Sequence, residues 1–242
     1  RGSGPGWERW HTCRLCEQDY HGVVACALGW ACWKTYVGRP ETDEIRVMAM
    51  TRLGTGLSAA KHHEDALSVQ ETELAIKQRI GAHEESILIT QTCLANTYGK
   101  LGRHEEAVPL EREIYSRQLK LNGEEHENTL LAAGNYASSL GTLKRLGEVK
   151  SVLRKTMPIA RRVLGEGHKY TLDLWTMYAM ALHEDTGATL DDLRESVTTL
   201  EETARTARRV LGDAHPTVSG IERGLKNARA VLRVREAPPG DA

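Results

Sequence analysis

Apolar residues recur at every third or fourth position along most of the chain, which is the spacing of an amphipathic helix. Between 190 and 211 the apolar positions are Leu190, Leu193, Val197, Leu200, Ala204, Ala207 and Leu211. Similar stripes precede them at Ala107, Leu110, Ile114 and Leu121, and at Val149, Val152, Ile159 and Val163. No segment alternates apolar and polar residues as a strand would. The pattern predicts an all-α protein in which each helix buries one face.

These helices repeat with a period of 42 residues. The stretch that begins at Gly165 resembles the one that begins at Gly123, 42 residues earlier, and the small residues Ala95, Ala137 and Ala179 keep the same spacing. The next junction, at Gly212, follows Gly165 by 47 residues, so the fourth unit carries five extra residues. A small residue flanked by large ones lets the two helices of a hairpin approach closely. The period therefore indicates a helical repeat protein.

The repeat divides the chain into three parts. Residues 1–41 form a cysteine-rich segment with a candidate zinc half-site and a capping helix over 23–36, and residues 236–242 form a disordered tail. Between them, 42–235 holds hairpins at about 42–81, 84–123, 127–165 and 169–212 and a last helix over 216–235, which caps the stack. Thr189 followed by Asp192 predicts a capping box at the start of a helix.

The stretch from Leu94 to Leu110 resembles the tetratricopeptide units of kinesin light chains, which also run 42 residues and end in a Leu-Gly-x-x-His-Pro turn, matched here by Leu211 to Pro216. The resemblance covers about 42–235. It implies a right-handed superhelical stack of antiparallel helical hairpins, a TPR-like α-solenoid. It also implies a scaffold or adaptor that holds a peptide segment of a partner protein in a concave groove lined by the first helix of each hairpin.

By this resemblance, a set of first-helix positions faces the groove. They are Thr92, Cys93, Asn96, Lys100, Gly134, Asn135 and Ser138. Asn135 keeps the groove asparagine of the family pattern, whereas Cys93 and Met177 replace it in the neighbouring units. Two alternatives stay open, because a buried asparagine can be purely structural and an exposed Lys100 can simply be solvated rather than contact an acidic ligand.

Four residues near the N-terminus have the spacing of a zinc knuckle, C-x2-C-x4-H-x4-C: Cys13, Cys16, His21 and Cys26. Three thiolates and an imidazole would close a tetrahedral structural site. However, Glu17 and Tyr20 stand where a knuckle needs glycine for its bend. In a second interpretation Cys13 and Cys16 are half of a site whose other ligands lie upstream of Arg1. In a third, no metal binds and Cys26 and Cys32 are small apolar residues of the capping helix.

Charge, the length of apolar runs and the number of cysteines limit the partners and compartments that we expect. Lys and Arg number 32 against 33 Asp and Glu, so no overall field attracts nucleic acid or an anionic membrane. The longest apolar run, Val23 to Trp33, is too short to span a membrane, which takes about 20 residues. Five cysteines, four of them crowded together, do not form a secreted disulfide framework and favour the cytoplasm. The start at Arg1 instead of Met suggests a piece of a longer chain.

No P-loop or nucleophile elbow occurs in the sequence, so we expect a binding protein and no enzyme.

Nucleic acid is the alternative partner: a zinc knuckle would bind single strands, with Tyr20 or Trp10 stacking on bases, and the repeats would act as a spacer. The densest basic group is Lys144, Arg145, Lys150, Arg154, Lys155, Arg161 and Arg162. Helical spacing spreads these residues around one hairpin, which favours a solvated surface over a nucleic-acid footprint.

Overall fold

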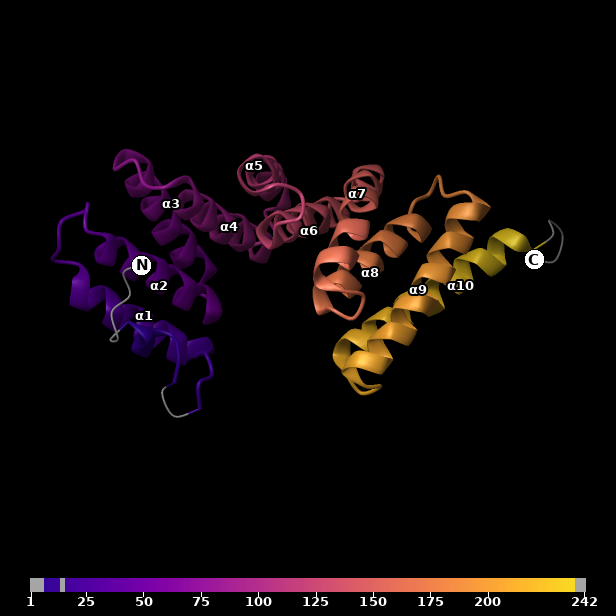
Figure 1. The fold of residues 1–242 in the computed structure, drawn as a ribbon, viewed down its shortest axis with the longest axis horizontal. Helices are drawn as coiled ribbons and strands as arrows, with labels where there is room; N and C mark the ends of the chain where they lie inside the picture. The colour runs from indigo at the N-terminus through magenta and orange to yellow at the C-terminus, as the bar shows by residue number, and fades with distance from the viewer. Residues whose placement is uncertain (1–6, 14–15, 238–242) are drawn as a thin grey trace. The chain divides into compact units, whose positions relative to one another are not determined.

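The computed structural model describes residues 7–13 and 16–237, and their regular structure is helical (Figure 1). The helices are α1 Gly22–Tyr36, α2 Glu44–Ala59, α3 His63–Arg79, α4 Glu84–Lys100, α5 His104–Asn122, α6 Glu127–Thr142, α7 Leu146–Leu164, α8 Lys169–His183, α9 Leu190–Leu211 and α10 Pro216–Glu236, preceded by the 3-10 helix η1 Glu8–Trp10. Within the described residues the only β-type pairing is an isolated bridge between Thr12 and Asp19. The predicted all-α repeat stack is confirmed. Most of the predicted tail, 238–242, lies outside the described residues.

A glycine and a histidine mark the junctions between hairpins. Gly123, Gly165 and Gly212 follow α5, α7 and α9 and adopt φ values of 81°, 94° and 82°, which a side chain would disfavour. Three residues later a histidine accepts a hydrogen bond at Nδ1 from the backbone N–H two residues ahead. These histidines, His126, His168 and His215, are the N-caps of α6, α8 and α10. Each junction therefore ends one helix and fixes where the next begins.

The chain divides into two compact units, residues 1–110 and 111–242. In the first unit α1 packs on α2, α2 on α3 and α3 on α4. Glycines bring α1 and α2 close, because a Cβ atom on Gly29 would lie 2.9 Å from the Arg52 carbonyl oxygen and one on Gly56 would lie 2.6 Å from that of Ala25. The predicted helix over 23–36 is confirmed.

A buried ion pair joins three helices of the first unit. The Lys77 Nζ atom lies 2.7 Å from Glu73 Oε1, and both side chains are almost fully buried in α3. Thr51 of α2 and Thr90 of α4 each donate a hydroxyl hydrogen bond to the same Glu73 oxygen, at 2.6 and 2.9 Å. Lys77 also donates to Thr90. Because the carboxylate is paired and hydrogen-bonded from two neighbouring helices, the network ties α2, α3 and α4 together.

In the second unit α6 packs on α7, α7 on α8, α8 on α9, and α10 on both α9 and α8. The core at the C-terminal end comes from three helices and includes Leu172, Leu200, Ile221 and Leu225. The capping box of Thr189 and Asp192 is present at the start of α9, as predicted. The opposite side of α10 carries Arg223, Lys226 and Arg233, which are exposed, so α10 caps the core with a polar face.

The predicted buried faces of the second helices are partly wrong. Leu121 and Val163, assigned to those faces, are 43% and 41% exposed, and Leu190 is exposed as well. In α7 the buried positions are Val149, Leu153, Thr156, Met157 and Ala160. The buried stripe of α7 is thus turned by about one residue from the predicted one, whereas in α9 Leu193, Leu200, Ala204 and Ala207 are buried as predicted.

One carboxyl in the second unit is buried with little compensation. Glu111 of α5 is 5% exposed, and its Oε2 atom has no hydrogen-bond partner in the structure. Burial raises the pKa of this carboxyl to about 7, although a hydrogen bond from Ser139 opposes the shift. The protonated form is therefore favoured in the folded protein.

Among the described residues, no helix is both long enough and apolar enough to cross a membrane.

The buried ion pair gives a stability prediction. Lys77→Met leaves the Glu73 carboxylate buried without its partner, so we expect the free energy of unfolding to fall by about 3–5 kcal/mol. Arg103→Met removes an exposed pair with Glu106, which solvent screens, and should therefore change the free energy of unfolding far less. Urea unfolding followed by circular dichroism compares the two variants. Equal losses would show that the pair does not hold the three helices.

Glu111 gives a prediction about pH. Because its folded pKa lies above the unfolded value of 4.5, stability is lost as the pH rises from about 4.5 to 7, and the cost is constant above that. Glu111→Gln should therefore raise the free energy of unfolding at pH 8 by about 1–3 kcal/mol and by much less at pH 5. The control is Glu113→Gln, an exposed residue paired with Arg117. Urea unfolding at both pH values measures the difference, and a gain independent of pH would contradict the assignment.

Candidate functional site

The four predicted groove residues of the first unit all lie on α4, in different surroundings. Thr92 is half-buried and bonds to the backbone of its own helix. Cys93 is half-buried near the Glu73–Lys77 pair, and burial raises the pKa of its thiol. Lys100 is exposed but donates a 2.8 Å hydrogen bond to Ser58 Oγ of α2. Asn96 is exposed. The structure thus leaves Asn96 as the most accessible member of this set, and Lys100 links two first helices.

In the second unit Gly134 has a structural role that the sequence did not reveal. A Cβ atom at this position would lie 1.9 Å from the Tyr170 hydroxyl oxygen, so only glycine leaves room for the ring. The Tyr170 hydroxyl donates to the carbonyl oxygens of Leu130 and Leu131, at 2.8 and 3.0 Å, and burial raises the pKa of this tyrosine. Gly134 is therefore covered by α8, and it offers no surface to a ligand.

Asn135 and Ser138, which follow Gly134 on α6, keep an accessible surface. Asn135 is half-buried and Ser138 is exposed. The residue 42 positions after Ser138 is Met180 of α8, an exposed apolar side chain. Leu131 of α6 is also exposed, and so is Ile89, which lies 42 residues earlier on α4. First helices in both units thus present large apolar side chains to solvent at repeat-related positions.

A cleft of about 680 Å³ in the second unit continues this row of positions. Asn227 and Val231 of α10 line it, and they follow Met180 and Glu184 of α8 by 47 residues, the spacing of the fourth unit. Asn227, two repeats after Ser138 in the same register, therefore lies in the wall of the cleft. Glu184 itself contributes to its wall.

The longer connection between the two helices of the fourth unit builds another wall of this cleft, with Glu184, Asp185 and Thr186. The connection between α8 and α9 runs from 184 to 189, whereas α6 and α7 are joined by 143–145. Glu184 accepts an ion pair from Lys144 at 2.7 Å, and Asp185 accepts one from Lys150 at 2.6 Å. The hydrogen bond from Lys150, followed by one from the Gly187 backbone N–H, lowers the pKa of Asp185. The two carboxylates are thus matched by lysines, and the cleft carries little net charge.

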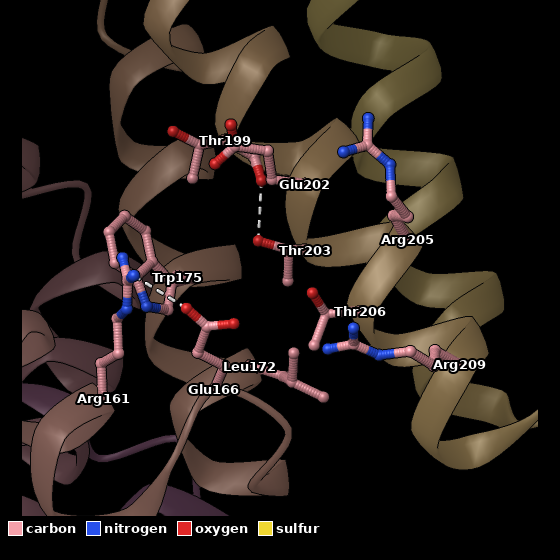
Figure 2. A pocket seen from close by; sticks show the side chains of 10 residues that line it. All are labelled: Arg161, Glu166, Leu172, Trp175, Thr199, Glu202, Thr203, Arg205, Thr206 and Arg209. Carbon is pink, nitrogen blue, oxygen red and sulfur yellow. Dashed lines mark hydrogen bonds and ion pairs between the residues drawn. The ribbon is translucent and has the colours of Figure 1, made fainter.

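A second cleft lies between α7 and α9, the second helices of neighbouring hairpins. It has a volume of about 460 Å³, and Figure 2 shows Trp175 of α8 and Arg161 on one side of it and Arg205 and Arg209 on the other. Arg161 is paired with Glu166 at 2.8 Å. Three threonines of α9 also point into this space, Thr199, Thr203 and Thr206. A smaller cleft of about 280 Å³ recurs one repeat earlier, between α5 and α7.

These two outer clefts use matching positions with different chemistry. Leu130 lines the smaller cleft, and Leu172, 42 residues later, lines the larger one. Ile159 of the smaller cleft likewise corresponds to Thr206 of the larger one, 47 residues later. The smaller cleft is lined by more apolar side chains, including Leu119 and Ile159. Their recurrence shows that the repeat itself creates them. None of the seven predicted groove residues lines either cleft.

The four candidate zinc ligands are not gathered by the structure. Cys26 lies in α1, where it packs against the apolar cluster of Leu53, Leu57 and Ala66. Among residues 7–13 and 16–237, no three His, Cys, Asp or Glu side chains are grouped as metal ligands would be. The bend at Glu17 does occur, with φ at 56°, and the Glu17 N–H donates to the Cys13 carbonyl oxygen. The half-site of Cys13 and Cys16 therefore stays a prediction.

The basic group of the third hairpin is largely neutralised. Lys144, Lys150, Arg145, Arg161 and Arg162 each pair with a carboxylate. Arg154 donates to the Tyr178 hydroxyl at 2.9 Å. The carboxylates belong to the protein's own surface, so this group supports the interpretation of a solvated face and not that of a nucleic-acid footprint.

Comparison with known proteins supports the same fold. Residues 86–162 match the tetratricopeptide repeat family. A kinesin light chain-type protein from Podosopora anserina with nearly identical TPR-like repeats has a TM-score of 0.67 at 22% identity, over 79% of this chain and 88% of that one. BtubC (BKLC) from P. vanneervenii has a TM-score of 0.66 at 13% identity, over 90% of this chain and 94% of that one.

A Rap protein complexed with Competence and Sporulation Factor is similar as well, with a TM-score of 0.54 at 14% identity, over 88% of this chain and 59% of that one. No curated protein matches the sequence significantly. The predicted resemblance is confirmed at the level of repeat and fold. Residues 86–162 match the tetratricopeptide repeat model, and the described chain shares the all-α repeat fold of the kinesin light chain-type structures.

Proposed function

We propose that this protein is a non-catalytic interaction scaffold that binds a peptide segment of another protein along the exposed side chains of its first helices. The observation that carries the proposal is the row of repeat-related positions in the second unit, Ser138, Met180 and Asn227, of which the last lies in the 680 Å³ cleft. An exposed methionine between two polar side chains offers an adaptable apolar contact flanked by hydrogen-bonding groups. That combination suits a peptide, whose backbone needs hydrogen bonds and whose side chains need apolar contacts.

The charge of the site limits which kinds of peptide it can be expected to bind. Lys144 and Lys150 already neutralise Glu184 and Asp185, so no strong field selects an acidic or a basic segment. We therefore propose a peptide with at least one apolar side chain, placed against Met180, and uncharged neighbours. The Rap protein that shares this fold was solved with Competence and Sporulation Factor bound, which supports a binding role for such an array.

We place this activity in the reducing interior of a cell. All five cysteines lie within the described residues, and no disulfide joins any two of them. Cys32 is fully buried in α1, and burial raises the pKa of its thiol to about 11, which keeps it protonated and unreactive. Thiols in such surroundings need no oxidising compartment, and the cytoplasm is the compartment we propose.

Display selection tests the proposal. Random peptides are selected on the whole protein, and the affinity of each selected peptide is measured by fluorescence anisotropy for wild type and for Met180→Glu. The glutamate places a charge on the proposed contact surface without entering the core, since Met180 is 38% exposed. We expect the dissociation constant to rise at least about tenfold because an apolar peptide side chain would then face a charge.

The matched control is Val163→Glu, an apolar residue of similar exposure, 41%, on the second helix α7. This variant should leave the affinity within about twofold, because its side chain lies outside the first-helix row. Peptides that bind wild type and Met180→Glu equally well would remove the proposed surface. A selection that yields no binding peptide would remove the proposed function.

A further inference from the structure

Helix α1 exposes more large apolar surface than any role within the chain explains. Val23 is 75% exposed, Val24 and Trp30 are exposed, and Val37, directly after the helix, is exposed as well. The helix contains a single charged residue, Lys34. A helix that is apolar on all sides normally lies in an interior, where every face has a partner. In this structure one face of α1 lacks such a partner among the described residues.

The two faces of α1 can be distinguished. One packs on α2 at Gly29 and Cys32, which are buried. The other carries Val23, Ala27, Trp30 and Lys34, which follow one another at intervals of three or four and are all exposed. These positions share one side of a helix. The exposed face is thus apolar along its first two turns and ends in a single positive charge.

The residues outside the described ranges offer little to cover this face. Residues 1–6 are Arg-Gly-Ser-Gly-Pro-Gly and residues 238–242 are Pro-Pro-Gly-Asp-Ala, and neither stretch contains a large apolar side chain. Leu15 is the only large apolar residue among all of them. One leucine does not match Val23, Val24 and Trp30 together, so these stretches do not account for the exposed face.

The charges at the two ends of α1 indicate which molecule fits. Glu17 is exposed and the Asp19 side chain is 71% exposed, and both lie just before the helix. Lys34 is exposed in the last turn. The helix is therefore acidic at its start and basic at its end. A second copy of α1 running in the opposite direction places acidic start against basic end twice, and the antiparallel helix dipoles favour the same arrangement.

We propose that the protein forms a two-fold symmetric dimer in which the exposed face of α1 packs antiparallel against the same face of a second copy. With the axis near Ala27, Val24 of one copy lies beside Trp30 of the other, and Val23 lies beside Ala31. The small side chain of Ala27 lets the two helices cross closely. An interface of this kind is self-complementary, as two-fold symmetry requires. The proposal is independent of the peptide-binding function, which uses first helices of the second unit.

The oligomeric state tests the proposal. Sedimentation equilibrium on the whole chain should show a monomer–dimer equilibrium. Val23→Glu should raise the dimer dissociation constant at least about tenfold, because it buries an unpaired charge at the contact. The matched control is Val234→Glu, a valine of equal exposure, 76%, on α10, which should change the constant by less than about twofold. A wild-type chain that stays monomeric at all concentrations, or a dimer that tolerates Val23→Glu, would overturn the proposal.

A charge exchange tests the antiparallel orientation separately. Glu17→Lys and Lys34→Glu should each weaken the dimer several-fold, since each creates two like-charge contacts, and the double variant should restore wild-type association. Both positions are exposed, so neither change affects the core. Circular dichroism confirms folding of every variant. A double variant no stronger than the weaker single variant would rule out the opposed arrangement.

Discussion

The structure depends most on one constraint, the junction at which each second helix stops and the next first helix starts. Gly123, Gly165 and Gly212 adopt a left-handed backbone conformation that other residues disfavour. A histidine three residues later caps the following helix through Nδ1, and an accepting Nδ1 carries no proton. Because both requirements are met at the backbone, the starting residues of α6, α8 and α10 are fixed, and every side chain after them points in a set direction.

This fixed direction explains why neighbouring positions on α6 have such different roles. Successive residues of a helix are turned by about 100° from each other. Gly134 therefore faces the adjacent helix α8 and receives the Tyr170 ring, whereas Asn135, the next residue, keeps part of its side chain accessible. The repeat likewise carries Met180 and Asn227 to matching places in later units. The repeat thus separates positions that hold the stack together from positions that are free to meet a ligand, and only the latter can vary without loss of stability.

The helices and their limits could be predicted from the sequence because they depend on local signals. The capping box at Thr189 and the junction glycines each act on the few residues beside them, and the 42-residue period shows where such signals recur. The partial exposure of Leu121 and Val163 could not be predicted from helical spacing, since it depends on what lies beside the last turn of each helix. The Glu73–Lys77 pair was missed for a different reason: hydrophobic patterning treats charged residues as solvated, and here two of them satisfy each other in the core.

Only part of the candidate site could be predicted, because the exposure of a side chain depends on elements that lie beside it in space. Resemblance to a repeat family identifies register positions, of which Asn96 and Ser138 are exposed. It does not reveal tertiary partners, and Gly134 and Lys100 turned out to be engaged with Tyr170 and Ser58. The cleft depends on an insertion. An alignment of the repeats shows that extra residues are present, but not that they form the wall of a cleft. Loop extension costs little free energy, so a repeat protein can acquire a new surface there without disturbing its core. The lysines that neutralise Glu184 and Asp185 belong to α7 and the turn before it, which is how one unit's insertion becomes part of a surface shared by two hairpins.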